Sequence, residues 1–146
     1  MKMSATTEAP VNHSAHNGHD RCLICGSLNP RSLHLSFQTS GDGGVRTRFT
    51  PADELQGYDG ILHGGVVASL LDAAMTHCLF HRGIRAVTGD LHVRYVQSVS
   101  CNAPFDICAC VLSSHPPLHR LRAEIVLDEH LLAWAEAKFM ERRALQ

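Results

Sequence analysis

One apolar stretch, Ile61 to Phe80, constrains the fold of this chain more than any other segment. It carries His63, Asp72 and His77, which a helix that spans a lipid bilayer would tolerate only at considerable cost. Apolar residues recur within it at helical spacing: Val66, Val67, Leu70, Leu71, Ala74 and Cys78. The pattern predicts a helix of about 19 residues, roughly 28 Å long, that ends at Gly83 and is buried in a protein core.

The segments around this helix have the patterns of strands. Leu33, Leu35 and Phe37 alternate with polar residues, and a glycine-rich turn leads to a second strand at Val45 to Phe49. Four β-compatible segments follow the helix: Ala86 to Val96, Phe105 to Ser113, Leu118 to Leu127 and Leu131 to Met140. Because a lone apolar helix needs enclosure, we expect an α+β fold in which an antiparallel sheet of about six strands wraps the central helix.

The composition and the net charge limit the number of domains and the classes of partner. A chain of 146 residues with 45% hydrophobic and 18% charged side chains predicts one compact domain. Since 13 Lys and Arg face 14 Asp and Glu, there is no basic field for nucleic acid or for a membrane surface. Residues 1–21 are polar and contain several histidines, so we expect a flexible tail before a single domain at 22–146.

The first residues and the cysteines indicate a compartment. Met1 to Pro10 lacks the apolar run of a secretory signal, so we expect a cytoplasmic protein whose six cysteines are free thiols or metal ligands. Cys22 and Cys25 are half of a zinc site, but no second pair accompanies them, and the sequence predicts no bound metal. Only histidines or a partner chain could complete the set: His13, His16, His19 and His34.

Glycines at the start of the helix suggest a site. Gly64 and Gly65 each cost the first turn about 1 kcal/mol relative to alanine. Bare N–H groups at a helix N-terminus, aided by the helix dipole, suit a polarised carbonyl or an oxyanion. Alternatively, the two glycines only permit a strand to pack closely on the helix.

A polar stripe along the same helix contains a carboxylate, because Gly65, Ser69, Asp72 and Thr76 share one face. Asp72 is costly there unless it is paired or functional, and a raised pKa would suit a general base. The alternative is an aspartate bonded to a nearby hydroxyl or strand amide. Asp72 lies about 12 Å along the axis from Gly64, whereas a base must come within ~3 Å of its target. Two copies packed antiparallel would bring the two together, which predicts a composite site in a dimer.

The motifs His63-Gly64-Gly65 and Leu71-Asp72 resemble the helix signature of hotdog-fold acyl-CoA thioesterases of the phenylacetate-degradation type. Further matches are Cys22-x-x-Cys25-Gly26 with Asn29-Pro30, Thr88 to Tyr95, and Ala137 to Met140, so that the resemblance covers about residues 22 to 141. It implies a hotdog fold and hydrolysis of an acyl-CoA thioester to free CoA and a carboxylic acid.

The resemblance also implies roles for single residues. The N–H of Gly65 or Gly64 holds the thioester carbonyl, and Asp72 from the partner subunit acts as base or nucleophile. His63 positions the substrate at the helix entrance, and Thr88 places a hydroxyl near the attacking water.

The expected substrate-binding residues lie around these groups: Gln56, Tyr58, Leu62 and Ser69. In the family an Asn or Gln often precedes the glycine turn, but that position is Gly57 here, with Gln56 beside it. Many relatives also carry Arg-Pro where this chain has Gln97-Ser98, so contacts to the CoA nucleotide are not carried over.

We therefore expect a thioesterase that works as a dimer or tetramer without metal or organic cofactor. One alternative is a non-catalytic module that binds or senses acyl-CoA on the same fold. Another is a metal-responsive interaction protein that uses the histidine-rich tail with Cys22 and Cys25. Release of free CoA thiol separates the enzyme from the first alternative, and stoichiometric zinc would support the second.

Overall fold

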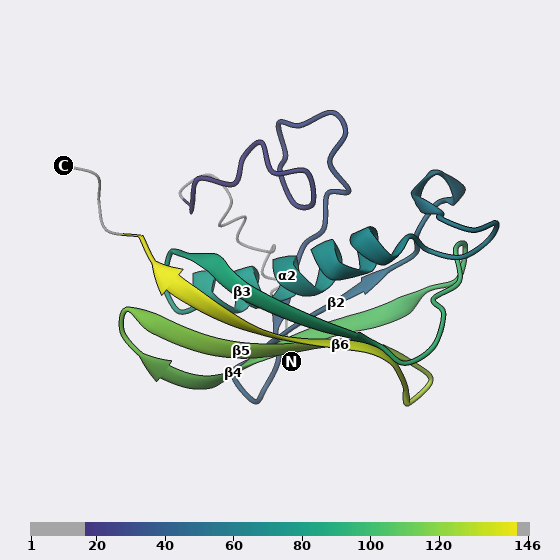
Figure 1. Ribbon diagram of the computed structural model, residues 1–146. Helices are drawn as coiled ribbons and strands as arrows, with labels where there is room; N and C mark the ends of the chain where they lie inside the picture. The colour runs from purple at the N-terminus through teal and green to yellow at the C-terminus, as the bar shows by residue number, and fades with distance from the viewer. Residues whose placement is uncertain (1–16, 143–146) are drawn as a thin grey trace, which may run out of the picture.

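The computed structural model describes residues 17–142. One long helix, α2 (Gly64–Phe80), lies across a six-stranded antiparallel sheet (Figure 1). The strands are β1 (Gln38–Thr39), β2 (Val45–Phe49), β3 (Ala86–Tyr95), β4 (Phe105–His115), β5 (Leu118–Leu127) and β6 (His130–Glu141). A 3-10 turn, η1 (Asp53–Leu55), precedes the helix. This architecture confirms the α+β prediction of a central helix against about six strands.

The order of strands across the sheet is β1-β2-β4-β5-β6-β3, and each neighbouring pair is antiparallel. Helix α2 connects β2 to β3, so the chain crosses the sheet and adds β3 at the far edge, next to β6. As a result β3 has a neighbouring strand on one side only within the described part of the chain, and it begins close to the C-terminal end of the helix.

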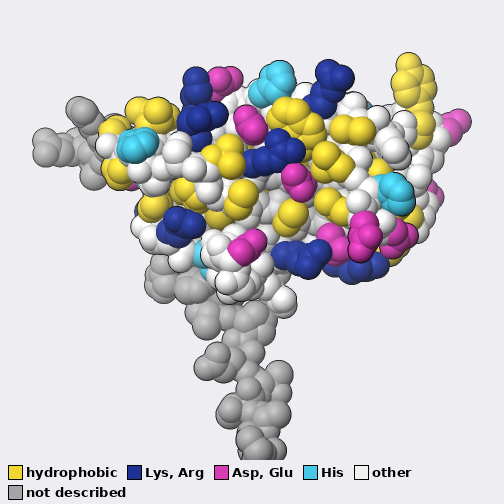
Figure 2. All heavy atoms as spheres, turned by 90° about the horizontal axis from the view of Figure 1, so that it is seen from below, with side chains coloured by type: hydrophobic (Ala, Val, Ile, Leu, Met, Phe, Trp, Pro, Cys, Tyr) yellow, Lys and Arg dark blue, Asp and Glu magenta, His cyan; other side chains and the backbone are white. Residues whose placement is uncertain are grey.

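The core lies between α2 and the face of the sheet that it covers. Alternate residues of the three central strands are buried there: Ile107, Ala109, Leu121, Ala123, Ile125, Ala133, Ala135 and Phe139. Figure 2 shows the opposite face, where charged side chains are interspersed with hydrophobic ones. On that face the guanidinium of Arg122 bonds Glu124 at 2.9 Å and Glu136 at 3.3 Å, and it stacks on Trp134. One face of the sheet is thus buried against the helix, and the other is exposed to solvent.

The helix is slightly shorter than predicted, with 17 residues that end at Phe80. His63 caps its first turn, and Gly83 leaves the helical path with a φ of +72°. Because glycine has no Cβ, it adopts this left-handed conformation at little cost. Among residues 17–142, no helix has the length and hydropathy needed to cross a membrane.

The predicted strand at Leu33–Phe37 is wrong. The predicted alternation of burial is present, but His34 has a φ of +52°, which interrupts an extended backbone. The amides of Leu33 and Leu35 donate to backbone carbonyls of residues 23 and 24, outside the sheet. Alternation therefore indicated correctly which side chains are buried, but it did not indicate the hydrogen-bond partner.

The chain from residue 17 to residue 32 covers the side of α2 that faces away from the sheet (Figure 1). Ile24 and Leu35 join the core, and the ring of His19 packs edge-on against Phe80 with 4.9 Å between centroids. Residues 17–21, which we assigned to the flexible tail, thus include a side chain with definite contacts to the helix. Residues 1–16 of the expected tail lie outside the described residues.

Candidate active site

A cavity of about 580 Å³ lies at the N-terminal end of α2. It is lined by the loop before the helix (57–58, 61–62), by 63, 64 and 67, and by 95–99 at the end of β3. Four of the predicted site residues are among them: Tyr58, Leu62, His63 and Gly64. A cavity of this size and mixed lining is typical of a small-molecule site.

His63 acts on the helix itself, because its Nδ1 accepts the N–H of Gly65 at 2.8 Å. A Cβ on Gly65 would lie 3.1 Å from that nitrogen, so glycine leaves room for the imidazole to fold over the first turn. The Gly65 amide is therefore already satisfied, and Gly65 does not line the cavity. Of the two glycines predicted to hold a carbonyl, the geometry favours Gly64.

The Gly64 peptide is open on its N–H side and fixed on its carbonyl side. Within the described part of the chain, its N–H donates no hydrogen bond. Its carbonyl accepts the hydroxyl of Tyr95 at 2.6 Å, and both residues line the cavity. Tyr95 was not among the predicted site residues, since nothing in the sequence pattern of β3 indicates that its hydroxyl reaches the helix entrance.

Asp72 and Thr88 meet at the middle of the helix. The Thr88 hydroxyl donates to Asp72 Oδ1 at 2.6 Å. Burial raises the pKa of the Asp72 carboxyl above its usual value, while the Thr88 hydrogen bond and the charge of His19 act in the opposite direction. This hydrogen bond is compatible with both hypotheses for Asp72. A general base oriented by a hydroxyl would make it, and so would a structural carboxylate with no catalytic role.

The other predicted residues serve mainly the backbone. Ser69 Oγ donates to the Gly65 carbonyl at 2.8 Å, as expected for a serine within a helix. The side chain of Gln56 accepts the N–H of Gly60 at 2.9 Å and so holds the loop beside the large cavity without lining it. A second cavity of about 140 Å³ contains Ser69, Asp72 and Thr76 of the polar stripe.

The two cavities share no lining residue. Gly64 and Asp72 belong to one straight helix and are about 12 Å apart along its axis at 1.5 Å per residue. A single chain therefore does not bring the Asp72 carboxylate to a carbonyl group held at Gly64.

A chain of polar contacts that the sequence did not predict surrounds a buried histidine at one end of the sheet. Ser114 Oγ lies 2.6 Å from His119 Nδ1, and His119 Nε2 lies 2.7 Å from Glu141 Oε1. His119 is fully buried, whereas the other two side chains reach the surface. None of the three lines either cavity, so their contacts connect β4, β5 and β6 rather than form a reaction centre.

Comparison with known proteins identifies the family. Residues 59–137 match the family model of the thioesterase superfamily, and the chain therefore belongs to this superfamily. A search of curated protein sequences gave no match.

Solved structures share the fold. The thioesterase superfamily protein RHA08564 has a TM-score of 0.74 and 25% identity over 79% of this chain, which spans only 60% of that relative. Zebra fish thioesterase superfamily member 2 has a TM-score of 0.72 and 20% identity, over 86% of this chain and 95% of that one. The BH2602 protein from Bacillus halodurans, solved with CoA, has a TM-score of 0.67 and 22% identity over 76% of each chain. These matches confirm the hotdog fold.

Proposed function

We propose that the protein hydrolyses acyl-CoA thioesters at a site shared between two copies of the chain. Membership of the thioesterase superfamily supports this reaction class, and a relative with the same fold was solved with CoA. The observation that carries the proposal is the separation of the unbonded N–H of Gly64 from the half-buried carboxylate of Asp72 on the same helix.

The free edge of β3 supports pairing with a second copy. Among residues 17–142 this strand of 10 residues pairs only with β6, and a free edge of that length is a ready template for another strand. Large apolar side chains are exposed along it and just after it: Val87 is 48% exposed, Tyr95 51% and Val96 49%. Both observations favour an interface on this edge.

The same strand carries one residue of each half-site, since Thr88 bonds Asp72 and Tyr95 bonds Gly64. A two-fold axis at His92 would pair the two β3 strands antiparallel, because a two-fold interface places the same patch of each copy against itself, and the bulge between Thr88 and Asp90 adds one residue on one side of that axis. Thr88 would then lie opposite Tyr95 of the partner subunit. Such an arrangement would bring the Asp72 of one copy toward the glycine turn of the other.

In this mechanism the thioester carbonyl oxygen accepts the Gly64 N–H in the larger cavity. Asp72 of the partner subunit takes a proton from water as the water oxygen attacks the carbonyl carbon, and Thr88 orients the carboxylate. The Gly64 amide and the positive end of α2 stabilise the oxyanion of the tetrahedral intermediate. The C–S bond then breaks, so that the carboxylic acid is released and the CoA thiolate takes up a proton.

The substitution Asp72→Asn tests this assignment, because it keeps the shape and a hydrogen-bond acceptor for Thr88 but removes the base. We expect kcat for release of free CoA thiol to fall by about 10²–10⁴-fold across a panel of acyl-CoAs. The matched control is Asp106→Asn on β4, away from the β3 edge, which changes a partly exposed carboxylate that lies 3.7 Å from Arg46 and 3.7 Å from Arg48.

Full turnover by the Asp72→Asn variant on every hydrolysed acyl-CoA would rule out the role of this carboxylate. Saturable binding of acyl-CoA by the wild-type protein with no release of thiol would instead support the sensing module and reject the enzyme.

A further inference from the structure

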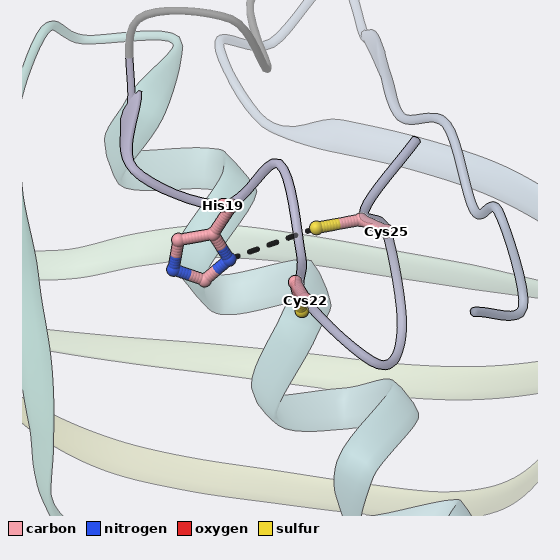
Figure 3. Close-up of side chains that lie close together, drawn as sticks. All are labelled: His19, Cys22 and Cys25. Atoms are coloured by element: carbon pink, nitrogen blue, oxygen red, sulfur yellow. Dashed lines mark hydrogen bonds between the residues drawn. The ribbon is translucent and has the colours of Figure 1, made fainter. Parts of the chain in front are cut away.

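Three potential metal ligands converge on the outer side of α2. The Nδ1 atom of His19 and the sulfur atoms of Cys22 and Cys25 all lie within 4.8 Å of one another. Figure 3 shows His19 and Cys25 facing each other, with the side chain of Cys22 close beside them. The sequence provided only the two cysteines, since any of four histidines could have joined them, and the fold places His19 there.

One distance within this cluster equals that between two ligands of a bound zinc ion. Zinc binds sulfur at about 2.3 Å and nitrogen at about 2.0–2.1 Å, so a tetrahedral ion separates its N and S ligands by about 3.6 Å. The distance between His19 Nδ1 and Cys25 Sγ is 3.6 Å. An S–H···N hydrogen bond would span a similar distance, but it would not by itself bring the second sulfur to the same point.

The backbone holds the ligands in place. The Gly26 N–H donates to the Cys22 carbonyl at 2.9 Å, and the Ile24 N–H points at the Cys22 sulfur at 3.4 Å. A Cβ on Gly26 would overlap the backbone of Asp20 and Cys22, so only glycine permits this tight turn. Because the turn is closed by these bonds, little reorganisation is needed to bind an ion.

The surroundings leave room for a fourth ligand. His19, Cys22 and Cys25 line the smaller cavity of about 140 Å³, together with Asp72 and His77. The Nε2 atom of His77 is buried and has no hydrogen-bond partner among residues 17–142. Buried polar atoms of this kind are usually satisfied by protein or by ordered water. A water on the fourth position of the ion, bonded to His77, would satisfy this nitrogen.

We propose that His19, Cys22 and Cys25 bind one zinc ion, with water in the fourth position, and that the ion fixes the conformation of residues 19–25 beside α2. Both sulfurs bind as thiolates, so uptake of Zn²⁺ releases their protons to solvent. All six cysteines are free thiols in the structure, and two of them are thus available for this role. The ion would share the smaller cavity with Asp72 but would take no part in the proposed hydrolytic step.

The test uses the full chain, reduced, stripped with a chelator and then given zinc alone before gel filtration and metal analysis. We expect about one zinc per folded chain and a higher Tm with zinc than without. Cobalt in place of zinc should give the sulfur-to-metal charge-transfer band of a tetrahedral thiolate site. Cys22→Ser with Cys25→Ser should reduce zinc uptake at least tenfold and remove the Tm shift.

Two further sets of variants test the zinc site if the double serine variant does not fold. Cys108→Ser with Cys110→Ser, on β4 away from the cluster, should retain one zinc. His19 is only half-buried, so His19→Ala should fold and bind zinc at least tenfold more weakly, while His19→Cys should restore binding. Uptake below a tenth of an equivalent by folded wild type, or equal loss of zinc in the β4 variant, would overturn the assignment.

Discussion

The substitution Gly64→Pro isolates the single amide on which the proposed oxyanion site depends. Proline lacks a backbone N–H, and Gly64 is the first residue of α2, where proline is well tolerated because its φ suits a helix. The residue before it is compatible, since His63 has φ −57° and ψ 133°, an extended conformation that a following proline favours. No hydrogen bond within the described part of the chain is lost, because the Gly64 N–H makes none there.

The expected effect is therefore on catalysis rather than on folding. Removal of one oxyanion donor typically lowers kcat by about 10²–10³-fold, or about 2.7–4 kcal/mol. A Cβ at position 64 would lie 3.5 Å from the Tyr95 hydroxyl, an ordinary contact, so the side-chain atoms themselves cost little. We expect Tm to stay close to that of the wild type while kcat for thiol release falls by that factor.

The matched control for this experiment is Gly64→Ala, which adds the same Cβ but keeps the N–H. We expect it to retain kcat within a few-fold of the wild type, measured on the same acyl-CoA at saturating concentration. The reasoning is refuted if Gly64→Pro turns over at the wild-type rate, or if Gly64→Ala loses as much activity as Gly64→Pro.

Three further outcomes are expected. Equal amounts of Asp72→Asn and Gly64→Pro, unfolded and refolded together, should recover about a quarter of wild-type kcat. Half of the randomly formed dimers are mixed, and each mixed dimer has one intact site of two. No recovery would contradict the shared site. Thr88→Val removes a hydrogen bond that lowers the Asp72 pKa, so the acid limb of the kcat/KM profile should move to higher pH, and an unchanged profile would deny Asp72 the role of base. Ser114→Ala leaves the buried His119 without its Nδ1 partner and should lower the free energy of unfolding in urea by about 1–3 kcal/mol, with hydrolysis per folded chain unchanged; lost hydrolysis would place this chain of contacts in the reaction.

The helix and most strands could be predicted because their apolar periodicity is strong and uninterrupted. The predicted bounds at Ala86 to Val96 and Leu118 to Leu127 differ from β3 and β5 by at most one residue. β4 runs on to His115, beyond the predicted Ser113, because a bulge between Val111 and Ser113 shifts its register without ending its pairing.

The sequence could predict which residues belong to the candidate site better than which contacts those residues make. Asp72 and Thr88 do meet, but which glycine amide stays open depends on the rotamer of His63, which a sequence pattern does not encode. Tyr95 reaches Gly64 across 31 positions in the chain, so this contact follows from tertiary packing and has no local signal. His19 and Cys25 are six positions apart, but which histidine joins the cysteines depends on the backbone turn between them.

The capped first turn of α2 has a consequence for the range of substrates. Since His63 occupies the second glycine amide, the helix entrance offers an incoming carbonyl one main-chain donor instead of a pair. A single donor holds the oxygen at a point but leaves rotation about that bond unrestricted, whereas two donors would also set the plane of the thioester. Discrimination among acyl groups would then come from the walls of the larger cavity, and a change of wall residues could alter the preferred chain without disturbing the reacting centre.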